Sequence, residues 1–283
     1  MRKISLHCAA TALVLVAPWP AAAAENNLNP NFAPDSSTGW IAAGQEFLPP
    51  SSGPGPVMYD PAQRPRPGIP AFRVADLSNP ILQPWVREEL RKANARARSG
   101  RAAYTPKERC WPIGVPGFVL YPVFPTYFVQ TPKQITMIWA EDHQVRRIYL
   151  NVSHSAQVKP SWFGESVGHY EGDTLVVDTI GLNTKTFVDN YRTPHTEKLH
   201  VVERFRMIDG GQTLEVRLHV EDEGAFTTPW AAIQRYRRVG AGGDTKDSRV
   251  PQAGLEEMVC AENNGDILNE GVDPIPQAER PDF

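Results

Sequence analysis

Apolar and polar residues alternate in short runs over most of the segment from residue 117 to residue 239. Alternation over four to eight residues is typical of a β-strand with one buried face. Turn residues separate the runs, and Asp209-Gly210-Gly211 between two of them is a strong hairpin signal. The pattern predicts about nine short strands, at residues 118–120, 127–130, 134–140, 145–151, 162–170, 174–180, 199–208, 213–221 and 231–239.

The strands follow one another without the helical spacers that a parallel sheet needs, so the sheet is expected to be antiparallel. A meander of hairpins has to protect its edge strands, and closure into a barrel does this. We therefore predict a mainly β protein, an antiparallel up-and-down barrel that is lipocalin-like in general form. A two-sheet sandwich is the alternative.

The rest of the chain divides around this strand-rich region. Residues 25–105 are predicted to form a Pro-rich arm with one helix, from about Gln83 to Ser99, that stops at Gly100. The run Pro49 to Pro56 is too rich in Pro and Gly for regular structure. Residues 106–264 are expected to form the barrel domain, and residues 265–283 a polar C-terminal tail.

The N-terminus has the parts of a secretory signal peptide. Arg2 and Lys3 precede an apolar run that ends near Ala17, and a tract of small residues leads to Ala24. This order predicts cleavage after about Ala24 and a periplasmic or secreted protein. The run is shorter than the roughly 20 apolar residues that cross a bilayer, and no later segment is apolar enough to do so.

Charge and cysteine content narrow the possible partners. The formal net charge is −3, with 29 basic and 32 acidic residues, which argues against a nucleic-acid ligand. Beyond the expected cleavage site the chain keeps Cys110 and Cys260. In an oxidising compartment these two most simply form one disulfide. A metal pair or a reactive thiol is less favoured, because neither cysteine has a C-x-x-C partner.

Alternation also assigns residues to faces, and Glu203 then shares the apolar face of its strand with Val201 and Phe205. Because burying a bare charge is costly, this carboxylate needs a partner. One interpretation is a general acid/base or a ligand-orienting group inside a cavity. The other is a structural ion pair with an inward-facing arginine.

A second group of polar residues lies on the strand at 162–170 and near it. Glu165 and His169 share one face of that strand, and Ser166 lies on the other. An acid and an imidazole so placed can shuttle protons, because histidine titrates near neutrality, although an ordinary surface pair has the same pattern. Asp178 is a candidate partner across the hairpin.

His154 and His195 lie in predicted loops, where ligand-contacting residues often collect. Solvated loop histidines would look the same. Tyr149, Trp139 and Trp230 are aromatic residues that form core or line a cavity for an aromatic, terpenoid or sugar-like ligand.

Two familiar chemistries are poorly supported by spacing. Gly164-Glu165-Ser166-Val167-Gly168 matches the G-x-S-x-G motif of α/β-hydrolases, but no helix follows the serine as that motif requires. The histidines form neither H-x-H nor H-E-x-x-H, so no metal site is predicted, and no cofactor is expected.

The segment from Trp162 to Thr179 resembles a widespread family of exported bacterial proteins with the signature W-x-G-x-S-x-G-x-x-E-G-D-T-L-V-V-D-T. The segments at Val145–Tyr149, His195 to Phe205 and Pro229–Trp230, and those around both cysteines, are also similar to that family. The likeness covers about residues 108–264. It implies a shared fold and pocket and supplies no reaction.

Together these patterns predict a periplasmic barrel enzyme that uses histidine and carboxylate groups for acid–base chemistry on a small organic substrate. A cofactor-independent lyase, isomerase or hydrolase fits best. Glu203 and His169 are the predicted proton-transfer groups, with His154 and His195 beside them and Glu165, Ser166 and Asp178 binding the ligand. The alternative is a non-catalytic carrier or sensor that binds a small molecule.

Overall fold

The computed structural model describes residues 29–35, 37–63, 73–101, 105–106, 110–120, 124–140, 142 and 144–240. The expected signal peptide and the polar tail lie outside these residues. Cys260 does so as well, so its disulfide with Cys110 stays a prediction.

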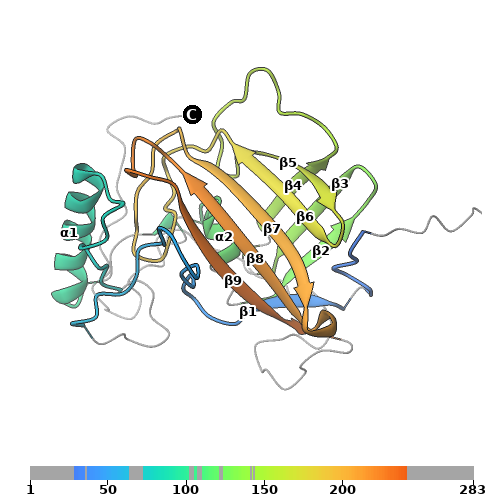
Figure 1. Cartoon of the computed structure of the whole chain (residues 1–283), viewed down its shortest axis with the longest axis horizontal. Helices are drawn as coiled ribbons and strands as arrows, with labels where there is room; N and C mark the ends of the chain where they lie inside the picture. Colours follow the sequence, from blue (N-terminus) through green and yellow to red (C-terminus); the bar gives the residue numbers. More distant parts are fainter. Residues whose placement is uncertain are drawn as a thin grey trace, which may run out of the picture.

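The described residues form a closed barrel of nine strands, with one long helix packed beside it (Figure 1). Each strand pairs with its neighbour in the sequence, and β1 pairs with β9 to close the barrel. The strands are β1 (Gly39–Ala42), β2 (Thr126–Gln130), β3 (Gln134–Trp139), β4 (Gln144–Leu150), β5 (Glu165–Glu171), β6 (Thr174–Ile180), β7 (His200–Ile208), β8 (Thr213–Glu221) and β9 (Trp230–Val239).

The prediction of a mainly β, barrel-forming chain is confirmed. One pairing departs from the antiparallel scheme, because β4 and β5 run parallel. The segment 151–164 between them returns the chain to the end at which β4 begins, so no tight hairpin joins these two strands. Every other neighbouring pair is antiparallel.

Two details of the predicted strand order were wrong. Residues 118–120 belong to the short helix α2 (Gly117–Leu120), in which all four residues are buried. A short apolar run that is buried on all sides has no alternation to distinguish strand from helix.

The strand that was not predicted is β1, which comes from the segment expected to be a separate arm. It has only four residues, too few to show alternation. Its Trp40 is buried and donates its indole N–H to the carbonyl of Phe32 at 2.8 Å. The boundary predicted between arm and barrel domain is therefore wrong, since the barrel closes only with residues 39–42.

The long helix α1 (Pro84–Arg98) confirms the helix predicted from the sequence. It begins with a proline, whose missing N–H costs nothing in the first turn. Asn94 on its buried face exchanges two hydrogen bonds with the backbone of Ala75, at 2.7 and 2.9 Å. These contacts fix the helix to the chain that precedes it. Among the described residues, no helix has the length and apolar character needed to span a membrane.

Candidate functional site

Glu203 points into the barrel and is fully buried, as its place in the alternation predicted. Its partner is Arg146 on β4, which is also fully buried. The guanidinium binds both carboxylate oxygens, with Nη1 donating to Oε1 at 2.9 Å and Nη2 to Oε2. Arg146 also donates to the hydroxyls of Ser166 at 3.2 Å and Thr179 at 3.0 Å. The geometry is that of the structural ion pair that the sequence left open.

Glu203 and His169, the two predicted proton-transfer groups, do not lie in one site. Strand register places Glu203 opposite Val177, whereas His169 lies opposite Val176, so the two side chains project from opposite faces of the sheet. His169 is exposed and its Nε2 contacts Glu171 at 3.1 Å. It is a surface pair.

Histidines and carboxylates instead alternate in a chain across the outer face of β5 to β8. We call this chain the acid–imidazole ladder. Its order, with each member in contact with the next, is Glu165, His154, Asp178, His200, Glu221 and His219.

The centre of the ladder is a single carboxylate oxygen. Asp178 Oδ1 lies 3.0 Å from Nε2 of His154 and 3.1 Å from Nε2 of His200. On its other side, Nδ1 of His154 lies 3.0 Å from Oε1 of Glu165. Both ring nitrogens of His154 therefore face carboxylate oxygens.

The hydrogen bonds of the ladder depend on how many N–H groups each imidazole carries. A neutral imidazole has one N–H donor and an imidazolium has two. His154 donates a hydrogen bond to both of its carboxylate partners only as an imidazolium. His200 likewise has to be an imidazolium to donate towards both Asp178 and Glu221. Each can lose one proton while the remaining N–H keeps the ring in place. The ladder can thus give up or accept protons with little movement of its side chains.

Glu165 fixes one end of the ladder to the segment 151–164. Its Oε1 accepts from the backbone N–H of Ser155 at 2.7 Å and its Oε2 from the Ser155 hydroxyl at 2.5 Å. The side-chain bond, followed by the backbone bond, holds the pKa of Glu165 below the ordinary glutamate value. The carboxylate is therefore ionised at neutral pH, ready to accept from His154.

The lowered pKa makes this anchor sensitive to acid. A carboxyl group whose pKa is lower in the folded state contributes stability above the unfolded pKa, and the contribution is lost as the pH falls through the folded pKa. Glu165→Gln should therefore lower the free energy of unfolding at pH 5 and above. The stability difference between the variant and wild type should become smaller when the pH falls below 4.5, the ordinary glutamate pKa. Denaturant titrations at several pH values measure it.

The control is Glu197→Gln, which alters an exposed loop carboxylate. A difference between wild type and Glu165→Gln that is the same at pH 3 and pH 7 would contradict the prediction.

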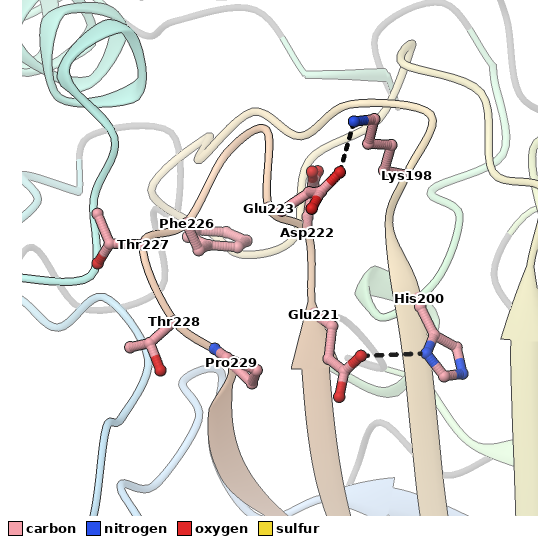
Figure 2. Close-up of a pocket in the computed structure, with 9 residues that line it drawn as sticks. All are labelled: Lys198, His200, Glu221, Asp222, Glu223, Phe226, Thr227, Thr228 and Pro229. Carbon is pink, nitrogen blue, oxygen red and sulfur yellow. Dashed lines mark hydrogen bonds and ion pairs between the residues drawn. The ribbon is translucent and has the colours of Figure 1, made fainter.

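The half of the ladder that contains His200 and Glu221 borders a groove of about 430 Å³, where β7 begins and β8 ends (Figure 2). His200 and Glu221 form part of its wall, with Nδ1 of His200 3.6 Å from Oε2 of Glu221. This distance is too long for a direct hydrogen bond. Phe226 and Pro229 supply apolar surface, and Thr227 and Thr228 add hydroxyl groups.

Charged groups at the mouth of the groove are mostly engaged with one another. Lys198 binds Glu223 at 2.6 Å. The buried Asp222 accepts from the backbone and hydroxyl of Thr196 at 2.6 and 2.7 Å, which shapes the turn around the groove. Glu221 accepts from Nε2 of His219 at 2.8 Å, and this bond holds its pKa below the ordinary glutamate value. Glu221 therefore presents a charged carboxylate beside His200.

His195 lies apart from the ladder and is buried. Its Nδ1 is 2.9 Å from the carbonyl oxygen of Thr196 and so donates to it, which leaves Nε2 to accept from the Thr186 hydroxyl at 3.0 Å. Burial lowers the pKa of His195, so the ring is neutral. The imidazole ties two loop segments together, and its contacts are those of a structural histidine.

The remaining predicted residues fall into different environments. Ser166 is buried, and its hydroxyl contacts Arg146 and Thr179 rather than an imidazole. Trp139 and Trp230 are core residues, with Trp230 packed against Phe226 at a ring distance of 5.8 Å. Tyr149 is exposed on the outside of the barrel.

Sequence reasoning selected His154, Glu165 and Asp178 separately but did not bring them together. It passed over His200 and Glu221, which complete the ladder. Register could have indicated them, since His200 pairs with Glu221 and both project outward, on the side of Asp178. Within the described part of the chain, no set of three His, Cys, Asp or Glu side chains is arranged to hold a metal ion.

Comparison with family models, curated proteins and solved structures finds no match to this chain. The resemblance to exported proteins with the W-x-G-x-S-x-G signature stays a prediction.

Proposed function

We propose that this chain is an exported, cofactor-independent enzyme that carries out acid–base chemistry on a small polar organic molecule. The substrate binds in the groove beside His200, and the acid–imidazole ladder supplies and removes protons. The observation that carries the proposal is the shared Asp178 oxygen, which joins His154 and His200 into one hydrogen-bonded chain that ends at the groove.

In this proposal His200 is the catalytic residue. Its Nε2–H donates to Asp178, which fixes the ring and leaves the lone pair of Nδ1 on the side of Glu221. A carboxylate that holds an imidazole in this way also stabilises the cation formed when the imidazole takes a proton. A neutral Nδ1 and the Glu221 carboxylate are both acceptors, so the gap between them favours a substrate O–H or N–H.

Glu221 orients that donor group, and Nδ1 of His200 removes its proton. Asp178 then lies between two imidazoles, and the charge on His200 is shared with the rest of the ladder through hydrogen bonds. General acid–base catalysis of this kind typically contributes a factor of about 10² to 10⁴ in rate. A lyase, isomerase or hydrolase without a cofactor can use it.

The proposal predicts a large difference between two histidine variants. Purified wild type, His200→Gln and His169→Gln are incubated with a library of small polar metabolites, and consumption is followed by mass spectrometry. His200→Gln should lower kcat by roughly 10² or more, because it removes the base. His169→Gln should retain wild-type rates, because its imidazole is also paired with a glutamate on the outer face but lies outside the ladder.

Asp178→Asn separates proton transfer from binding. It keeps a side chain of the same size but removes the charge that stabilises the His200 imidazolium, so kcat should fall while KM changes little. Equal loss of activity in His200→Gln and His169→Gln would contradict the proposal. Small molecules that bind to the wild type but are never converted would also contradict it, because that result would identify a carrier.

A further inference from the structure

Two tryptophans and one lysine meet on the surface at a place that the acid–imidazole ladder does not use. Trp111 precedes α2, Trp162 precedes β5, and Lys185 follows β6. The two indole rings have centroids 5.0 Å apart and are inclined at 50°, so they form a wedge rather than a stack.

The ammonium group of Lys185 lies over both rings. Its Nζ is 5.6 Å from the Trp111 centroid and 5.7 Å from the Trp162 centroid. Cations are attracted to the face of an aromatic ring within about 6 Å, and tryptophan is the strongest such partner. The wedge is therefore a place where this protein already holds a positive charge over two adjoining indoles.

The walls of the wedge are built into the fold. The backbone of Ser161 donates to Gly181 at 2.9 Å and accepts from Asn183 at 2.9 Å, which joins the Trp162 segment to the Lys185 segment. Gly114 lies so close to both that an added Cβ would be 2.9 Å from the Trp162 carbonyl and 2.8 Å from the Thr186 hydroxyl. The two rings are thus brought together by backbone contacts that do not depend on the lysine.

Lys185 itself is the adaptable part of the arrangement. Its residue is exposed, and its ammonium reaches the wedge at the end of a long flexible side chain. A ligand cation that entered the wedge would replace this ammonium, since two like charges cannot share it without repulsion.

We propose that the wedge of Trp111 and Trp162 is a binding site for a small organic cation of the quaternary ammonium class, which Lys185 occupies in the free protein. Quaternary ammonium groups are the ligands that such aromatic pairs recognise best, because they are cationic, bulky and weakly hydrated. The site is independent of the proposed catalysis at His200. Its occupant and the substrate of the groove need not be the same molecule.

Choline is the probe, and 3,3-dimethylbutan-1-ol is its neutral isostere. Isothermal titration of the full chain should show choline binding to Lys185→Ala about tenfold more tightly than to wild type, because the competing ammonium is gone. Lys185→Arg keeps a competing cation and should resemble wild type. The neutral isostere should bind Lys185→Ala at least about fivefold more weakly than choline does.

Trp162→Ala in the Lys185→Ala background should abolish choline binding. Trp162→Phe keeps an aromatic ring with a weaker attraction for cations, so it should reduce choline binding without abolishing it. Circular dichroism checks that both variants are folded. Trp85→Phe, which alters an exposed indole on α1, is the matched control and should leave binding unchanged.

Three results would overturn the proposal: no saturable choline binding to Lys185→Ala, equal binding of choline and its neutral isostere, or choline binding that survives in Trp162→Ala. Saturable binding of a neutral sugar such as glucose, with none of choline, would also overturn it and would assign the wedge to carbohydrates.

Discussion

Replacing Arg146 with methionine is expected to lower the free energy of unfolding by about 3–5 kcal/mol. The substitution leaves the Glu203 carboxylate inside the barrel without its cation, and an uncompensated buried charge is far more costly than a missing pair. Chemical denaturation followed by tryptophan fluorescence measures the change. A smaller loss, below about 1 kcal/mol, would show that water reaches Glu203 and that the pair is not buried in solution.

A double variant separates the charge from the packing. Arg146→Met with Glu203→Leu removes both ionic groups and should recover much of the stability lost in the single variant, because an apolar pair of similar volume can replace a buried ion pair. Arg204→Met is the matched control. Arg204 binds Glu171 on the exposed outer face, and its loss should cost less than about 1 kcal/mol.

Replacing Trp40 with alanine is expected to cost about 3–5 kcal/mol as well, for a different reason. Trp40 lies on β1 and is one of the largest fully buried side chains. Its removal leaves a cavity where β1 closes the barrel against β2 and β9 and also frees the Phe32 carbonyl. The same denaturation experiment measures the effect.

Trp85→Ala is the comparison for that variant. Trp85 lies on α1 with its side chain partly exposed and donates to the Gly224 carbonyl at 2.7 Å. Its loss should cost much less than the loss of Trp40. Equal effects would mean that β1 packs no more firmly than the surface of α1, and that the N-terminal segment is an appendage of the barrel rather than part of it.

The strands that alternate most clearly were predicted almost residue for residue. Residues 174–180 and 213–221 coincide with β6 and β8, because each strand has one buried and one outward face. The prediction failed where burial is uniform, as in α2, and where a strand is too short for a pattern, as in β1. For β1 the deciding contacts come from β2 and β9, which are far away in the sequence.

The candidate site was predictable only in part. Alternation correctly sent Glu203 inward and placed Glu165 and Ser166 on opposite faces of their strand, because that assignment depends on strand parity alone. It could not decide whether Glu203 would meet an arginine or a histidine. Arg146 is 57 residues away, and only the barrel brings β4 and β7 into contact through its interior.

The sequence by itself determined that this chain forms short strands with one apolar face, because apolar and polar residues alternate within each run. It also determined, through strand parity, that Glu203 lies in the core. The tertiary structure alone decided which polar side chains meet. The parallel pairing of β4 with β5 and the course of residues 151–164 place His154 beside Asp178, while the pairing of β7 with β8 brings Glu221 to His200. Proton exchange between such groups depends on distances of about 3 Å across different strands, which no local pattern encodes.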